Sequence, residues 1–365
     1  MAERNLAVWN RPVFVADGQT IAVGDVMFAA HFRGELQPAW TRLLLVVERE
    51  QRAADISEGD ERAANEAALQ SRSDEFRYER ELISAEETDR WLEDRGLTLE
   101  DFNAYFLRHY WADTLDEPTE PEALDFRSAP DAFRDLLRAE LLLSGEFDRM
   151  ARALSWRFAA AHVEGNQLAQ HLAAGEPSGQ LNAIEPDDAS LQDWSARLGC
   201  DPGWPGAVRE LETAYQRHCE RLLTAERLEH SLGSLRLPLT RLELETIDLD
   251  SLDAVREALL CVREDGAPMS EVAADGRYPY RRTEVVVEDL PAELQQKLLS
   301  AVPGEVLEPL AHADGFQLCR LLGKTGPDLT DDHVRDRVER QILERHFSEL
   351  TARCVRWLLA LDGTP

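Results

Sequence analysis

The sequence lacks the features that mark several common protein classes. Its five cysteines are scattered and form no CxxC pair, so neither a disulfide framework nor a cysteine zinc site is indicated. No apolar run is long enough to cross a bilayer, and the first residues hold no apolar segment of signal-peptide length,. We therefore expect a cytoplasmic protein with reduced thiols.

Positive charge is also scarce. The chain has 40 Lys and Arg residues against 70 Asp and Glu residues, which gives a formal net charge of −30. Such a field repels phosphate backbones and anionic lipids. We therefore expect neither a nucleic-acid partner nor a membrane partner. The hydrophobic fraction of 44% in 365 residues is enough for more than one core,.

Motifs for common catalytic and metal chemistry are missing or incomplete. The Gly-Lys-Thr at 323–325 lacks the upstream glycine of a phosphate-binding loop, because position 318 is leucine,. It is therefore expected to be a turn that ends a strand. Two pairs of helical histidines stand nine and twelve residues apart, whereas metal ligands on one helix face prefer three or four,. No GxSxG elbow is present,. We expect no cofactor, no metal and no catalytic residue.

The first part of the chain predicts a hairpin followed by helices. Two apolar runs flank Asp17-Gly18, a strong signal for a two-residue turn,. Asp25 is then expected to be the N-cap of a helix. From about residue 35 to 115 the apolar spacing is helical. Within it, Ser84 and Glu87 form a capping box, and the proline-bearing segment 116–130 predicts a domain boundary,.

A second helical block follows, from about residue 131 to 232, interrupted by a loop at 173–188 that is rich in glycine and proline,. The stretch "DWSARLGC" (193–200) is similar to "RWLEDRGL" (90–97). Either a duplication or a shared helix-stop pattern explains this similarity.

The pattern changes near residue 235. "RLELETI" alternates polar and apolar residues as a strand does,. It is followed by a helix "LDAVREALLCVRE", an apolar turn "APMSEVAAD", an apolar run "EVVVE", a helix "LPAELQQKLLS", a turn "VPGEV" and a strand "DGFQLCRLLG". Residues 331–360 are then expected to form one long helix with Thr330 as its N-cap. The apolar stripe of this helix needs a large partner, so we expect it to pack back on the N-terminal helices.

This order of elements over residues 239–324 resembles the parvulin-type (PpiC-like) prolyl isomerase domain. The most specific part is "PAELQQKLLSAVPGEVLEPLAHADGFQLCRLL". Upstream, the block that ends in "LISAEETDRWLEDRGLTLEDFNAYFLRHY" is similar to the N-terminal chaperone domain of SurA-like proteins. The resemblance implies a predominantly helical α+β protein. Its expected parts are a SurA-like domain at 1–125, a helical block at 126–235, a parvulin-like domain at 236–327 and a returning C-terminal helix at 328–365.

The chain departs from the family at the positions that carry its chemistry. Active parvulins resemble one another in a histidine on the first strand and another on the last. Here the first strand has no histidine and the last carries Gln317, while Met269 stands where an aromatic residue is usual. The resemblance therefore implies a degenerate isomerase domain that keeps an apolar groove. The residues expected to contact a peptide are Leu244, Met269, Leu294, Leu298, Phe316, Gln317 and Leu318.

The function that this resemblance implies is non-catalytic peptide binding. Cytoplasmic relatives with eroded isomerase domains look like accessory proteins that hold a precursor peptide while a ribosomally synthesised peptide is modified. The expected partners are a precursor or unfolded peptide and peptide-modifying enzymes, and a homodimer is left open. Two alternatives are open as well. One is a divergent prolyl isomerase that uses Gln317, Cys319 or the strand carboxylates Glu243 and Glu245. The other is a general cytoplasmic holdase.

Overall fold

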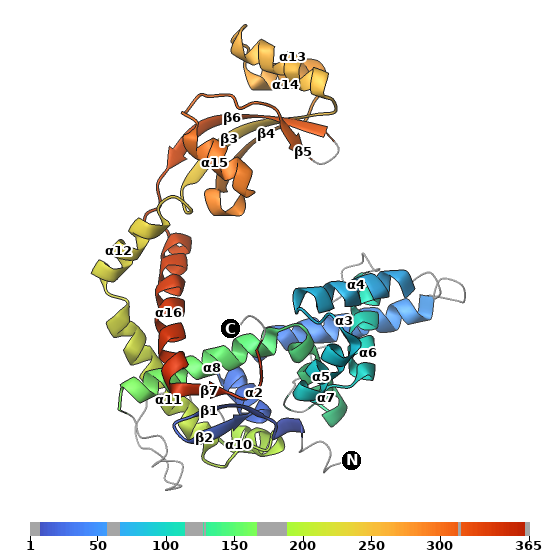
Figure 1. Cartoon of the computed structure of the whole chain (residues 1–365), viewed down its shortest axis with the longest axis vertical. Helices are drawn as coiled ribbons and strands as arrows, with labels where there is room; N and C mark the ends of the chain where they lie inside the picture. The colour runs from blue at the N-terminus through green and yellow to red at the C-terminus, as the bar shows by residue number, and fades with distance from the viewer. Residues whose placement is uncertain are drawn as a thin grey trace. The chain divides into compact units, whose positions relative to one another are not determined.

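The computed structural model describes residues 8–56, 66–113, 127, 129–165, 188–312 and 315–361. The fold is α+β and predominantly helical, as the sequence predicts (Figure 1). The chain divides into two compact units. Unit 1 consists of Met1–His218 with Phe347–Pro365, and unit 2 is Cys219–His346. Most of the predicted boundary at 116–130 and of the predicted loop at 173–188 lies outside the described residues.

Unit 1 contains a small three-stranded sheet and a set of helices. Its strands are β1 Pro12–Ala16, β2 Gln19–Ala22 and β7 Val355–Trp357, in the order β2-β1-β7. Its helices are α2 Val23–Phe32, α3 Leu36–Ile56, α4 Glu66–Glu79, α5 Ala85–Arg95, α6 Leu99–Asp113, α7 Asp131–Leu143, α8 Glu146–Val163, α10 Asp188–Arg197 and most of α11 Trp204–Leu222. Of these helices, α2 and α8 pack on the strands.

The predicted hairpin is present. Asp17 and Gly18 connect β1 to β2 with φ angles of 48° and 78°, the left-handed pair that a tight hairpin turn requires. Asp25 does not cap α2, because β2 continues directly into the helix and Ala22 is the N-cap. The Asp25 carboxylate instead accepts the Ala22 N–H from the third helical position, at 2.9 Å. The predicted capping box of Ser84 and Glu87 is confirmed at the start of α5.

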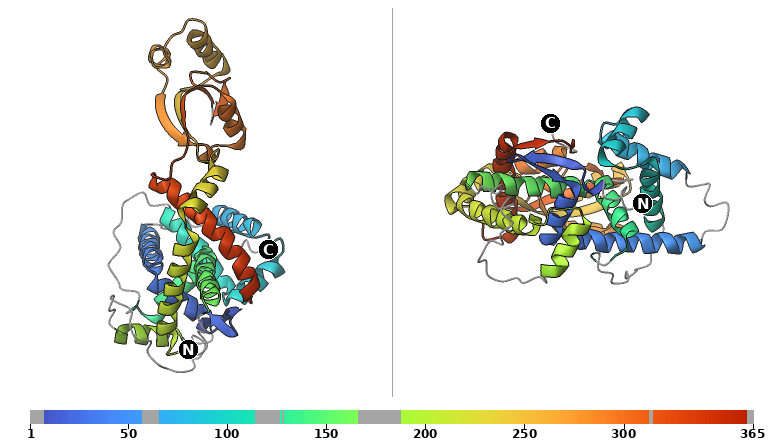
Figure 2. Two further views of the ribbon diagram at one scale, coloured as in Figure 1. Left: turned by 90° about the vertical axis from the view of Figure 1, so that its left-hand side faces the viewer. Right: turned by 90° about the horizontal axis from the view of Figure 1, so that it is seen from below.

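The C-terminal segment ends in a strand, which the sequence did not predict. Helix α16 ends at Cys354, and Val355–Trp357 pairs antiparallel with β1 through Phe14 and Trp357 (Figure 2). The alternation of a β-branched and an aromatic residue around Arg356 suits a strand. Residues 355–357 become a strand because they pair with β1, and this distant partner leaves no signal in the local sequence. The predicted single helix over 331–360 is therefore wrong beyond residue 354.

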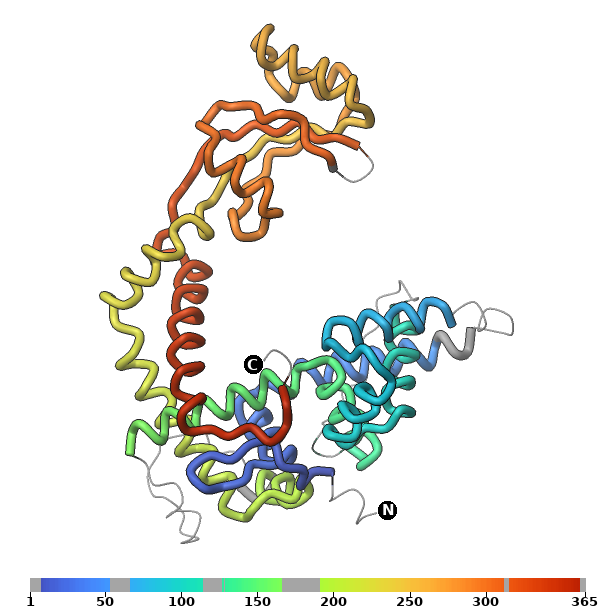
Figure 3. Tube along the Cα trace, in the orientation of Figure 1, coloured from blue at the N-terminus to red at the C-terminus, as the bar shows by residue number. Residues whose placement is uncertain are grey.

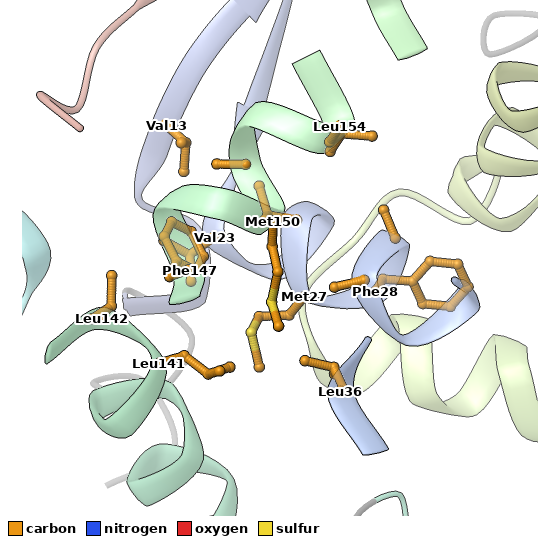
Figure 4. Close-up of a cluster of buried hydrophobic side chains, with 14 of the residues drawn as sticks. Val13, Val23, Met27, Phe28, Leu36, Leu141, Leu142, Phe147, Met150 and Leu154 are labelled. Atoms are coloured by element: carbon orange, nitrogen blue, oxygen red, sulfur yellow. The ribbon is translucent and has the colours of Figure 1, made fainter. Parts of the chain in front are cut away.

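One hydrophobic core fills unit 1 and draws residues from both predicted helical blocks, on either side of residue 125. Trp40 of α3 and Trp194 of α10 are among its largest buried side chains. In Figure 4, Met27 of α2 and Met150 of α8 point toward one another within this core. The two blocks thus share a core, although a segment with three prolines joins them in the sequence.

A close backbone approach in this unit leads to the first prediction. A Cβ atom added to Gly24 of α2 would lie 2.1 Å from the Leu198 carbonyl oxygen. We expect Gly24→Ala to lower the free energy of unfolding by about 2 kcal/mol or more, because the backbone must move to relieve the clash. Gly206→Ala in α11 is the matched control, since its Cβ would meet nothing within 4 Å. Urea denaturation followed by tryptophan fluorescence measures both. Equal stability of the two variants would contradict the close packing of α2.

Unit 2 is a four-stranded antiparallel sheet with helices on both faces. The strand order is β4-β3-β6-β5. The elements are the end of α11, α12 Ala225–Leu235, β3 Arg241–Leu249, α13 Leu252–Arg263, α14 Met269–Gly276, β4 Tyr280–Val286, the short 3₁₀ helix η2 Val287–Asp289, α15 Ala292–Ser300, β5 Leu310–His312, β6 Gly315–Thr325 and α16 Asp332–Cys354 as far as His346.

The two faces of this sheet carry separate cores, and Figure 3 shows α13 and α14 on one side of the sheet and α15 on the other. Helices α13 and α14 pack on one face, which we call the α13 face, against Ile247 and Leu318. Helix α15 packs on the other face, which we call the α15 face, against Leu242 and Leu321. Ladder partners lie on the same face and successive residues alternate. The pairing therefore gives the face of each paired residue, with one register shift between Glu243 and Leu244 in the β3–β6 ladder.

Three local expectations for unit 2 are corrected. The segment "APMSEVAAD" contains the helix α14 rather than only a turn, with Pro268 as its N-cap. The Asp331 carboxylate accepts the His333 N–H at 2.9 Å, so Asp331 rather than Thr330 caps the start of α16. Residues 323–325 continue β6 instead of forming a turn, because they pair with β3 as far as Arg241.

Candidate functional site

Strand β4 forms an open edge of the unit 2 sheet. Within the described part of the chain it pairs with β3 alone, over seven residue pairs. The side chains of residues 280–284 are all exposed, on both faces of the sheet. The other edge strand, β5, has only three residues. A long uncovered edge offers unpaired backbone groups to another chain.

The ends of the β3–β4 pairing show which backbone groups point outward. The Asp248 N–H donates to the Pro279 carbonyl at 3.1 Å, and the Val287 N–H donates to the Thr240 carbonyl at 3.0 Å. Both pairs belong to the same unbroken register, and hydrogen-bonded positions alternate along an antiparallel pair. The odd-numbered residues of β4 therefore bond to β3, and the even-numbered residues direct their N–H and C=O groups away from the sheet. The outward-facing residues at the exposed part of this edge are Tyr280, Arg282 and Glu284.

A charged network lies beside this edge on the α13 face. The Tyr280 hydroxyl donates to Oε1 of Glu245 at 2.7 Å, and Arg320 Nε donates to Oε2 of the same carboxylate at 2.8 Å. The hydrogen bond to Glu245 raises the pKa of Tyr280. Arg282 Nε donates to Glu243 at 2.9 Å. Two carboxylates of β3 thus fix the orientation of the Tyr280 and Arg282 side chains. Less side-chain conformational entropy is then lost when a partner binds at this edge.

On the α15 face, Gln317 hydrogen-bonds to its direct ladder partner. Its Nε2 donates to Oδ1 of Asp248 at 2.7 Å, and Arg281 lies 3.2 Å from Oδ2. This is the position where the sequence resemblance leads us to expect a histidine in an active parvulin. A carboxamide does not titrate near neutral pH, so it serves as neither a general acid nor a general base. The arrangement can therefore offer hydrogen bonds but supplies no imidazole for acid–base chemistry.

Four of the seven predicted peptide-contact residues are core residues. Met269, Leu298 and Leu318 have no exposed surface, and Leu244 is almost fully buried. They also divide between the two faces. Met269 and Leu318 pack with α13, whereas Leu244 and Leu298 pack with α15. In this conformation these four side chains cannot contact a ligand at the surface.

The other three predicted residues are half-buried but are not gathered at one place. Leu294 packs against the α15-face core and Phe316 against the α13-face core. Gln317 lies on the α15 face, beside Asp248. The side chains that flank the open edge are not among the predicted residues, because the sequence pattern indicates only the apolar end of this strand, "EVVVE". The polar run Arg281–Glu284, directly before the apolar Val285 and Val286, is the signal that could have indicated them.

Cys319, one of the alternative catalytic residues, is buried on the α15 face. Burial raises the pKa of its thiol to about 11. At pH 8 we expect alkylation of Cys319 by iodoacetamide to be about 100-fold slower than for an ordinary exposed thiol, because so little thiolate is present. Mass spectrometry of the intact fold measures this, with the half-buried Cys261 as the internal comparison. Rapid alkylation of Cys319 would favour the divergent isomerase instead.

Other places offer less to a ligand. A pocket of about 290 Å³ in unit 1 is lined by residues of α3 and α8 together with Glu35. Its arginines, Arg42 and Arg149, both pair with Glu146.

Among the described residues, no group of three or more His, Cys, Asp or Glu side chains could hold a metal ion. No helix in the same part of the chain is long and apolar enough to span a membrane.

The chain matches no family model, no curated protein and no solved structure. The assignment of the open β4 edge and its polar side chains as the candidate site therefore rests on their geometry alone.

Proposed function

We propose that unit 2 binds an extended polypeptide, which adds as a further strand to the edge of β4. The observation that carries this proposal is the outward direction of the backbone at Tyr280, Arg282 and Glu284, within the stretch 280–284 whose side chains are all exposed. Backbone hydrogen bonds give strand addition its affinity with little demand on sequence. Such a site suits a protein that holds a polypeptide.

The order of elements in unit 2 supports a parvulin-like origin for this domain. It runs strand, two helices, strand, helix and two strands, which extends the order on which the resemblance rests. At the family's last-strand histidine position, Gln317 is hydrogen-bonded to Asp248. This favours holding a peptide over isomerising it, since neither side chain provides an imidazole.

The client that we propose is the precursor of a ribosomally synthesised, modified peptide, held in the cytoplasm for its modifying enzymes. This part of the proposal comes from the resemblance. The edge itself adds a preference, because Arg281 and Arg282 flank it on opposite faces. Acidic residues in an added strand would lie beside these guanidinium groups, where cross-strand charge pairs are favourable.

A calorimetric titration tests this function. The full chain is titrated with the precursor peptides encoded beside its gene, and in parallel with a reduced and alkylated unfolded polypeptide of unrelated sequence. We expect saturable binding of at least one precursor and weaker binding of the unrelated chain. Equal binding of both would assign the protein to the general holdases. Binding of neither would exclude the proposed function.

A further inference from the structure

The edge of β4 carries two glutamates in an unfavourable arrangement. In the β3–β4 register Glu284 lies directly opposite Glu243, and like charges opposite one another destabilise a pair of strands. Glu243 is satisfied by Arg282, whereas Glu284 has Arg241 only at 3.4 Å and is 60% exposed. Glu284 therefore has room for a further cation on its outer side.

The outward backbone groups restrict how a second strand can pair with this edge. An antiparallel partner must place its own outward-facing residues opposite the even-numbered residues of β4. For a second copy of the same strand, related by a two-fold axis, three central registers are possible. They are centred on Arg282, Thr283 or Glu284.

Only the register centred on Thr283 is favourable. It places Arg282 opposite Glu284 of the second copy, and the symmetry repeats this pair in reverse. Thr283 then meets its own equivalent, a pairing that is common between strands. The register centred on Arg282 would place two arginines opposite each other, and the one centred on Glu284 would oppose two glutamates.

We propose that this edge also binds a second copy of the chain, through antiparallel β4–β4 pairing centred on Thr283. Both faces remain consistent, because the two-fold axis is perpendicular to the sheet and joins each face to its equivalent. On the α13 face the charges then alternate across the boundary, from Arg320 through Glu245 and Arg282 to Glu284 of the second copy. The pairing covers an edge that contains no proline and is otherwise open,.

This inference concerns the same edge as the proposed function, so a second copy and a peptide compete for it. The two claims remain separable, because self-association is measured without any peptide. A monomer that binds peptide would overturn only the pairing of two copies. A chain that dimerises at high concentration but binds no peptide at concentrations where it is monomeric would overturn only the proposed function.

Sedimentation velocity of the full chain over a range of concentrations tests the pairing. We expect a monomer–dimer equilibrium for the unmodified chain. Arg282→Glu and Glu284→Arg should each weaken it by about tenfold or more, because both symmetric pairs become repulsive. Arg256→Glu, at an exposed site on α13, makes the same charge change as Arg282→Glu but away from the edge, and should leave association unchanged.

Two further samples exclude a simple folding defect. An equimolar mixture of the Arg282→Glu and Glu284→Arg chains should form a heterodimer, because every facing pair is then of opposite charge. The chain carrying both substitutions should again pair with itself. A monomeric unmodified chain at all concentrations would overturn the proposal. So would single variants that associate as tightly as the unmodified chain, or a mixture that stays monomeric.

Discussion

Glu284→Pro is expected to weaken peptide binding by about tenfold or more, the cost of one lost backbone hydrogen bond and a poorly fitting ring. The Glu284 N–H points away from β3, so proline removes a donor from the open edge and leaves the β3–β4 hydrogen bonds intact. Edge strands tolerate proline at such positions. Fluorescence anisotropy of a labelled precursor peptide, titrated with the full chain, measures the change.

The control for this variant is Glu284→Ala, which removes the same carboxylate but keeps the N–H group. Its affinity should stay within about threefold of the unmodified chain if backbone pairing provides most of the binding energy. Thermal unfolding of both variants shows whether unit 2 is intact. Equal affinities of the proline and alanine variants would contradict strand addition at β4.

Phe347→Ala is expected to lower the stability of unit 1 by about 3 to 5 kcal/mol, as for other buried aromatic side chains. Phe347 is fully buried where the chain returns to unit 1. Its ring stacks on Trp156 at 5.3 Å with an interplanar angle of 12°, and Tyr215 lies at the same distance. Loss of this ring would leave a cavity between α16, α8 and α11.

Urea denaturation followed by tryptophan fluorescence tests this prediction, because Trp156 is in contact with the removed ring. Leu358→Ala is the control close by in sequence. Its side chain is 43% exposed, so it should change stability by less than about 1 kcal/mol. If both variants unfolded at the same urea concentration, the C-terminal segment would not contribute to the core of unit 1.

The elements that the sequence predicted well are those with local signals. The hairpin at Asp17-Gly18 and the capping box at Ser84 depend on residues a few positions apart, and both are present. Strand β7 was missed because its partner, β1, lies at the other end of the chain. Three residues after a long helix give too short a pattern to indicate a strand. Only the tertiary pairing makes Val355–Trp357 extended.

The predicted peptide contacts show a different limit. Apolar residues such as Met269 and Leu318 fit an apolar groove, yet such residues are also the ones that fill a core, as these two do,. The open edge was not visible in the sequence, because the direction of a backbone N–H group depends on strand order and register. Arg282 indicates a binding edge only through the strand order, in which β4 pairs with β3 alone among the described strands.

Amide hydrogen exchange along β4, resolved by NMR, is the most direct test of strand addition. In the free monomer the outward N–H groups of Tyr280, Arg282 and Glu284 should exchange fast, whereas those of Arg281 and Thr283, bonded to β3, should be protected. Saturating precursor peptide should slow the outward groups by about tenfold or more, since each would gain a hydrogen bond. Unchanged fast exchange at these three amides in the peptide-saturated protein would contradict strand addition to β4.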